Sequence, residues 1–116
     1  MNSRQIRREN RIPASTLSSH YKNFKVVTSK KNNLTAMTVD ASRSGIGFYA
    51  DAYSTDFTIG SKIELHLEGQ KKPVFGKVVY AKAIGGLTRV GTELEKEEGY
   101  AEYKKGIVDE EKKVLS

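Results

Sequence analysis

The chain has 116 residues and a net charge of +6, and it contains no cysteine. This length predicts one domain with a single hydrophobic core. The lack of cysteine excludes disulfides and thiolate-ligated metals and suits a reducing compartment. No apolar run approaches the roughly twenty residues of a membrane helix, and the N-terminus does not resemble a signal peptide. We therefore expect a soluble, cytoplasmic protein without membrane insertion.

The first thirteen residues carry the densest positive charge of the chain. They hold one acid, Glu9, and four arginines: Arg4, Arg7, Arg8 and Arg11. No strand or helix pattern covers this stretch, so we expect residues 1–13 to form a flexible arm and residues 14–116 to form the folded domain. Positive charge concentrated at one end predicts an anionic partner.

Short segments with strand character follow the arm. They are rich in β-branched residues or alternate apolar with polar residues, and turn-forming residues separate them. We expect strands over residues 24–29, 34–40, 45–50, 63–67, 73–84 and 87–94. Gly85 and Gly86, between the last two, predict a hairpin.

The C-terminal segment changes to a helical period. Tyr100, Tyr103 and Ile107 fall on one face of a helix, which we place at about residues 95–110. Gly99 and Gly106 favour a short helix or one that ends near Gly106. Short strands with glycine-rich turns and one terminal helix predict an all-β fold, either a small antiparallel barrel or a sandwich.

The sequence offers little for catalysis. His20 lies in a polar stretch, and His66 lies on the outer side of an alternating strand, where histidine is usually a surface residue. No Ser/His/Asp set, phosphate-binding glycine loop or metal-ligand spacing is present. We therefore expect no catalytic residue, no metal and no cofactor, and the protein is not predicted to be an enzyme.

A second motif lies between two predicted strands. In the stretch VDASRSGIGF, Asp40, Ser42 and Gly45 have the spacing Asp-x-Ser-x-x-Gly. An ordinary turn can explain these residues, because Asp and Ser cap backbone N–H groups and Gly supplies a positive φ. A turn alone does not require them at these offsets together with an arginine-rich arm upstream, so a binding role is the competing interpretation.

The two motifs together resemble a known family. RRENRIP followed by DASRSG is similar to the paired signature of PilZ domains, small bacterial barrels that bind the second messenger cyclic di-GMP. The later stretch GKVVYAKAIGGLTRVGTEL resembles the closing strands of these domains. The resemblance covers about residues 4–94 and implies a six-stranded antiparallel β-barrel. It also implies a cyclic di-GMP site formed by Arg-x-x-x-Arg on the arm and Asp-x-Ser-x-x-Gly on the barrel.

The resemblance assigns the ligand-binding residues, although two arginine pairs satisfy the first spacing. The implied set is Arg7, Arg8, Arg11, Asp40, Ser42 and Gly45. Family members place the second arginine before an apolar residue that enters the first strand, which favours Arg7 and Arg11 over Arg4 and Arg8. Arg4 is then a general electrostatic contact. Whether one or two ligand molecules bind stays open.

These residue types suit a guanine dinucleotide. An arginine fork can hold phosphate oxygens or read the O6/N7 edge of guanine. A carboxylate such as Asp40 accepts from the N1–H and N2–H donors of the opposite edge, and Ser42 can add a hydroxyl hydrogen bond. We therefore predict a receptor that closes its arm over cyclic di-GMP and signals to a separate, unidentified effector protein.

Two alternatives remain at this point. The first is a small basic barrel that binds nucleic acid, and the second is a PilZ-like interaction module without a ligand. Nucleic acid is the weaker reading, because the acidic C-terminus would repel a long polyanion and the aromatic residues lie mostly in apolar strand contexts. These aromatic residues, which we expect in the core rather than on a binding surface, are Phe24, Phe48, Tyr49, Phe57, Phe75 and Tyr80.

Overall fold

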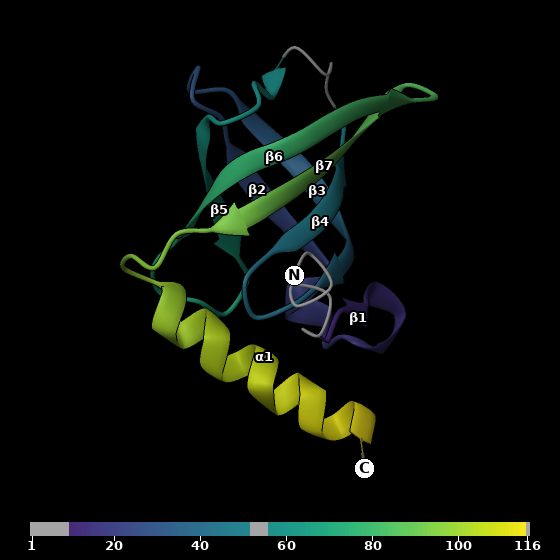
Figure 1. The fold of residues 1–116 in the computed structure, drawn as a ribbon, viewed down its shortest axis with the longest axis vertical. Coiled ribbons are helices and arrows are strands. Elements are labelled where there is room, and N and C mark those ends of the chain that lie inside the picture. Colours follow the sequence, from purple (N-terminus) through teal and green to yellow (C-terminus); the bar gives the residue numbers. More distant parts are fainter. Residues whose placement is uncertain (1–9, 52–55, 116) are drawn as a thin grey trace, which may run out of the picture.

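The computed structural model of the chain describes residues 10–51 and 56–115, which form an antiparallel β-barrel with one long helix (Figure 1). In chain order, the elements are β1 (Ile12–Pro13), the 3-10 helices η2 (Ala14–Thr16) and η3 (Ser19–Tyr21), β2 (Asn23–Val27), β3 (Asn33–Ala41), β4 (Ile46–Ala50), β5 (Lys62–Leu67), β6 (Val74–Ile84), β7 (Leu87–Leu94) and α1 (Tyr100–Leu115). Each of the six expected strands is present, with boundaries within two residues of those predicted.

The sheet closes on itself. Its strand order is β1-β3-β2-β5-β6-β7-β4, and β4 also pairs with β3, so the six longer strands form a barrel in which every pairing is antiparallel. The predicted six-stranded antiparallel barrel is confirmed. Closure leaves no unpaired edge along most of the sheet. It also lets β3 pair with β2 through its first half and with β1 through its last two residues.

Alternating apolar residues build the core, as the sequence pattern predicts. Ile63, Leu65 and Leu67 point inward from β5 and are at most 5% exposed. Phe24 and Phe57 each pack edge-to-face on Phe48, with ring centroids 5.3 and 5.9 Å apart. Edge-to-face aromatic pairs are favourable beyond the area that they bury, so these rings stabilise the centre of the barrel.

The β6–β7 hairpin has the predicted tight turn. Gly85 and Gly86 both have positive φ, 52° and 89°, and Ile84 pairs with Leu87 across the two-residue loop. Positive φ at both central positions is the geometry of a type I′ turn, which matches the twist of the flanking strands. Only glycine takes this conformation readily, which explains the Gly-Gly sequence.

The helix differs from its predicted range of 95–110. α1 begins at Tyr100, because Gly99 has a φ of 93° and its backbone lies so close to Pro73 that a Cβ would be 2.2 Å from the Pro73 carbonyl oxygen. The helix also continues through Gly106 to Leu115. Gly106 therefore does not end the helix; its missing side chain makes room for the Tyr21 hydroxyl, which would lie 1.8 Å from a Cβ there.

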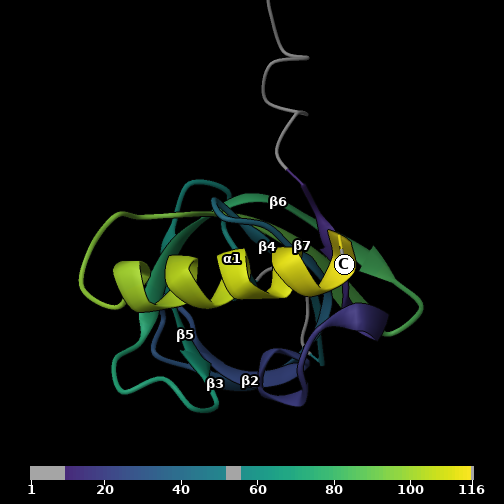
Figure 2. The same cartoon turned by 90° about the horizontal axis from the view of Figure 1, so that it is seen from below.

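α1 crosses one open end of the barrel, as the view from below shows (Figure 2). The predicted face packs inward: Tyr103 and Ile107 are fully buried. Two acids of the following turn, Glu110 and Glu111, are also buried, at 4% and 6% exposure. Hydrogen bonds to the barrel make their burial possible, because a buried carboxylate without partners would be strongly unfavourable. Among the residues described, no helix combines the length and apolar composition that a membrane span requires.

The end of the predicted arm belongs to the barrel. Ile12 and Pro13, which we expected within the flexible arm of residues 1–13, form β1 beside β3. Ile12 is 3% exposed, and its burial in the core provides the physical reason for this difference. The two 3-10 helices that follow were not foreseen. Three residues of the predicted site, Arg4, Arg7 and Arg8, lie outside the described residues.

Candidate functional site

The two sequence motifs meet at the guanidinium group of Arg11. Its Nη2 donates a 2.8 Å hydrogen bond to Oδ1 of Asp40, and its Nη1 donates a 3.4 Å bond to Oγ of Ser42. The pairing of Ile12 with Ala41 brings these residues together, since it places the residue before β1 beside the residues that flank Ala41. The hydrogen bond to Asp40 raises the pKa of Arg11, although burial works in the opposite direction. The group is therefore fully charged at neutral pH.

The turn between β3 and β4 holds the second motif in a fixed shape. Ser42 is fully buried, and its backbone N–H donates to the carbonyl oxygen of Gly45 at 2.8 Å. Leu94 in β7 donates to the carbonyl oxygen of Ser44 at 2.7 Å. These bonds attach the turn to β7, so the residues at its surface are held in position.

Gly45 has a different role from the one that an ordinary turn suggests. Its φ is not positive, so the turn interpretation is wrong on this point. A Cβ at Gly45 would instead lie 2.5 Å from the backbone oxygen of Thr92 in β7, and 4.0 Å from Nη1 of Arg11. The glycine is needed because two backbones approach each other closely here.

A pocket of about 310 Å³ opens beside the Arg11–Asp40 pair. It is lined by Arg11, Asp40, Val79, Tyr80, Arg89, Gly91 and Thr92. The register of β6 against β7 shifts between Val78 and Tyr80, as in a β-bulge, and Val79 and Tyr80 are 46% and 43% exposed. Bulges commonly redirect side chains near binding sites. The expectation that Tyr80 belongs to the core is therefore wrong. Tyr49 and Phe75 are only partly buried, whereas Phe24, Phe48 and Phe57 are buried.

Sequence reasoning did not find the second guanidinium of the site. Arg89, in β7, places its guanidinium 5.5 Å from the ring centre of Tyr80 and 5.8 Å from that of Tyr49. A Cβ at Gly47 would lie 3.0 Å or less from both terminal nitrogens of Arg89 and from Oδ1 of Asp40. Arg89 therefore lies in the neighbourhood of the carboxylate that Arg11 contacts. The available signal was the alternation of β7, which turns Arg89 away from the core, between the inward-facing Thr88 and Val90.

The helix contacts the motif turn directly. The hydroxyl of Tyr103 donates to the carbonyl oxygen of Ser42 at 2.6 Å, and that of Tyr100 donates to the carbonyl oxygen of Arg43 at 3.0 Å. Arg43 in turn binds the carboxylate of Glu111 through Nε and Nη2, at 2.7 to 3.2 Å. The turn thus has the Arg11 site on one side and α1 on the other.

The two histidines are not part of this site. His66 is exposed and lies 3.1 Å from the carboxylate of Glu64. The ring of His20 packs at a tilt against that of Tyr21, with ring centroids 4.4 Å apart. Within residues 10–51 and 56–115, no group of three or more His, Cys, Asp or Glu residues could hold a metal ion.

Comparison with known proteins identifies the domain. The PilZ domain family matches residues 5–102, which is most of the chain. The chain belongs to the PilZ domain family. PilZ domains are non-catalytic receptors of cyclic di-GMP, in agreement with the prediction that the chain is not an enzyme. None of the curated proteins compared with this PilZ domain matches it.

Solved structures show the same fold. The PilZ domain of YcgR from Escherichia coli, solved with cyclic di-GMP, has a TM-score of 0.62 and 15% identity, and the match covers 92% of each chain. MrkH of K. pneumonia, solved as a complex with cyclic di-GMP, has a TM-score of 0.63 and 14% identity over 93% of this PilZ domain. The match covers 50% of the MrkH chain. At these identities, the likeness shows the fold alone.

Proposed function

We propose that this PilZ domain is a cytoplasmic receptor for cyclic di-GMP that closes its N-terminal arginine segment over the ligand and signals to a separate effector protein. The observation that supports this proposal best is the position of Arg11, which contacts both Asp40 and Ser42 although these residues are about thirty positions away in the sequence. Residues 40–45 and the end of the arm therefore form one binding surface.

The charges of the surface fit a dinucleotide with two phosphates. Arg11 is 48% exposed and can exchange its bond to Asp40 for a bond to a phosphate or a guanine edge. Asp40 would then be available for the N1–H and N2–H donors of guanine, which distinguish this base from adenine. Arg89 lines the same pocket as Asp40 and provides a second cation there.

Micromolar affinity corresponds to about 8 kcal/mol, so several contacts must act together. Two charge-assisted arginine bonds contribute about 3–6 kcal/mol, and stacking of a base on Tyr80 contributes about 1–3 kcal/mol. Ordering of the arm costs about 1–2 kcal/mol per residue. The cost is reduced because Ile12 and Pro13 already pair with β3. Hydrogen bonds from the ligand to Asp40 and Ser42 must then supply the remaining binding free energy.

Calorimetric titration of the purified chain tests the proposal. Cyclic di-GMP, cyclic di-AMP and a mixed-sequence oligonucleotide are compared at low and at physiological salt. We expect a dissociation constant of about 1 μM or lower for cyclic di-GMP, weaker binding at the higher salt, and at least about tenfold weaker binding of cyclic di-AMP. Heat from the oligonucleotide alone would favour a nucleic-acid-binding barrel. No heat from any of the three would favour an interaction module without a ligand.

A further inference from the structure

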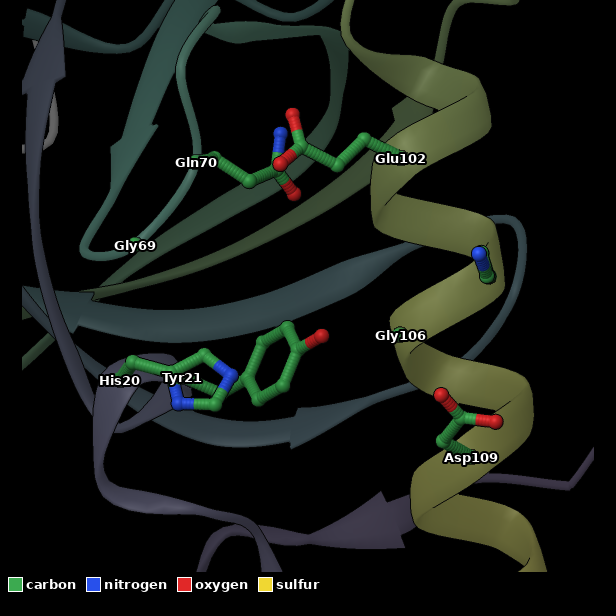
Figure 3. A pocket seen from close by; sticks show the side chains of 8 residues that line it. His20, Tyr21, Gly69, Gln70, Glu102, Gly106 and Asp109 are labelled. Carbon is green, nitrogen blue, oxygen red and sulfur yellow. The ribbon is translucent and has the colours of Figure 1, made fainter.

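A second pocket lies between η3, the loop after β5 and α1, where α1 crosses the end of the barrel (Figure 3). Its volume is about 300 Å³, at the lower limit for small-molecule pockets, which is enough for one side chain. The side chains that line it come from η3 (His20 and Tyr21), from the loop after β5 (Gln70) and from α1 (Glu102, Lys105 and Asp109). None of these residues belongs to the Arg11 site. We call it the α1 pocket.

The acidic side chains of the α1 pocket are presented together by the helix. Glu102 and Asp109 are seven positions apart, and Gly106 lies between them, so all three share one face of α1. Figure 3 shows this face turned toward the ring of Tyr21. Lys105 is the only lysine or arginine in the pocket lining, against two carboxylates. The pocket therefore favours a cation.

Two polar groups of the pocket lack hydrogen-bond partners among the described residues. Tyr21 is only 6% exposed, and its hydroxyl, which lies against Gly106, makes no hydrogen bond to any described residue. Gln70 uses its Nε2 to donate to the carbonyl oxygens of Lys72 and Gly99, which leaves its buried Oε1 without a donor. Buried polar groups in folded proteins normally have partners, so the Gln70 oxygen is evidence of a missing donor. The Tyr21 hydroxyl is open to the pocket and can accept from such a donor.

The surroundings of Tyr21 also favour a positive charge. The pKa of its hydroxyl is raised to about 12, first by burial and also by the carboxylates of Glu110, Asp109 and Glu102, which repel the phenolate. A field that disfavours an anion at the hydroxyl favours a cation there. The rings of His20 and Tyr21, whose centroids are 4.4 Å apart, also place aromatic faces beside the acidic groups.

We propose that the α1 pocket binds an arginine side chain presented by a partner protein. A guanidinium group has five N–H donors in one plane, which matches two carboxylates and the two unpartnered oxygens better than an ammonium group does. Its flat face can also lie over one of the two aromatic rings, His20 or Tyr21. The site is independent of cyclic di-GMP, and it gives the domain a surface through which an effector could bind.

Nuclear magnetic resonance with a defined probe tests this proposal. The ¹⁵N-labelled chain is titrated, without cyclic di-GMP, with the blocked tripeptide acetyl-Gly-Arg-Gly-amide, and in parallel with the same peptide containing citrulline. Citrulline has almost the shape of arginine but no charge. We expect saturable shifts at the amides of Tyr21, Gly69, Gln70 and Gly106, with a dissociation constant of about 1 mM, and about tenfold weaker binding of the citrulline peptide. Equal binding of the two peptides, or shifts centred outside these residues, would overturn the proposal.

A matched pair of double variants separates the pocket from the general charge of the surface. Glu102→Gln/Asp109→Asn removes the two exposed acids of the pocket, whereas Asp51→Asn/Glu93→Gln removes two exposed acids that do not line it. The first pair should weaken binding of the arginine peptide at least about fivefold, and the second should change it by less than about twofold. Equal losses would show that the peptide responds only to net charge. All four positions are exposed, so both variants should keep the wild-type circular dichroism spectrum.

Discussion

The hydroxyl of Tyr103 donates a 2.6 Å hydrogen bond to the carbonyl oxygen of Ser42, inside the turn that carries the Asp-x-Ser-x-x-Gly motif. Tyr103 is fully buried, so this bond joins the first turn of α1 to the residue that Arg11 contacts from the other side. The helix and the binding turn are thus one packed unit. A change in the turn on ligand binding would therefore change the position of α1 on the barrel.

Tyr103→Phe tests how much this bond stabilises the fold. The substitution keeps the ring but removes the donor from the Ser42 carbonyl oxygen, so we expect the free energy of unfolding to fall by about 1–3 kcal/mol in urea denaturation. Tyr100→Phe removes a 3.0 Å bond to the Arg43 carbonyl oxygen at an exposed position and is the matched control. It should cost less than about 1 kcal/mol. Equal losses for the two variants would show that burial of the bond is unimportant.

Arg11→Ala should weaken cyclic di-GMP binding at least about tenfold, because a charge-assisted arginine bond contributes about 1.5–3 kcal/mol. The free energy of unfolding should change by less than about 1 kcal/mol, since the pair with Asp40 is half exposed. Arg11→Lys keeps the charge but loses the fork, and it should recover only part of the affinity. Calorimetry and thermal melts measure the two effects separately.

The choice of arginine pair has its own test. If Arg7 and Arg11 form the Arg-x-x-x-Arg motif, Arg7→Ala should reduce affinity for cyclic di-GMP about as strongly as Arg11→Ala. Arg4→Ala should then reduce it only slightly and lower its salt dependence. The reverse order, with Arg4 and Arg8 essential and Arg7 and Arg11 dispensable, would show that the other pair binds the ligand.

Alanine substitutions at two nearby glycines, Gly45 and Gly47, should have different effects. Gly45→Ala places a Cβ 2.5 Å from a backbone oxygen of Thr92, which cannot move away cheaply, so it should destabilise the fold by about 1–3 kcal/mol. Gly47→Ala places its Cβ 2.8 Å from the end of the flexible Arg89 side chain. It should fold with near-wild-type stability and bind cyclic di-GMP more weakly, as denaturation and calorimetry on the same samples would reveal.

Tyr80→Leu tests the aromatic surface of the Arg11 site. Tyr80 is 43% exposed, so its replacement should change stability little, whereas loss of a stacked base should weaken cyclic di-GMP binding about fivefold to a hundredfold. Tyr49→Leu is the comparison, because its ring contacts Arg89 but does not line the pocket. Unchanged affinity of Tyr80→Leu would exclude base stacking at this position.

The stability of the domain should depend on Glu110 at acidic pH. Burial by itself raises the pKa of this carboxyl, but hydrogen bonds from Ser18 at 2.5 and 2.9 Å and from Lys113 at 2.9 Å outweigh it, and the net pKa is lowered. A lowered folded pKa means that the stabilisation is complete above the unfolded value near 4.5 and is lost as the pH falls through the folded value. Urea denaturation from about pH 6 to about pH 3 should show a shallower pH dependence for Glu110→Gln than for the wild type. An unchanged slope would contradict this role, and exposed Glu93→Gln should leave the slope intact.

The sequence by itself determined the strands and the motif residues of this protein. Alternation in segments such as residues 63–67 depends only on which side chains face the core, and a Gly-Gly pair between two strands requires only local backbone geometry. The motifs also indicated the candidate site, because Asp40, Ser42 and Arg11 are residue types with definite hydrogen-bonding chemistry.

The tertiary structure alone decided how distant segments approach one another. Gly106 suggested the end of a helix, yet the helix continues because Tyr21, 85 positions earlier, occupies the space of the missing side chain. Tyr80 lines the site because the register of β6 against β7 shifts beside it. Arg89 reaches the site from the neighbouring strand, β7, near Asp40. Such contacts depend on the closure of the barrel, a long-range property that no local pattern contains.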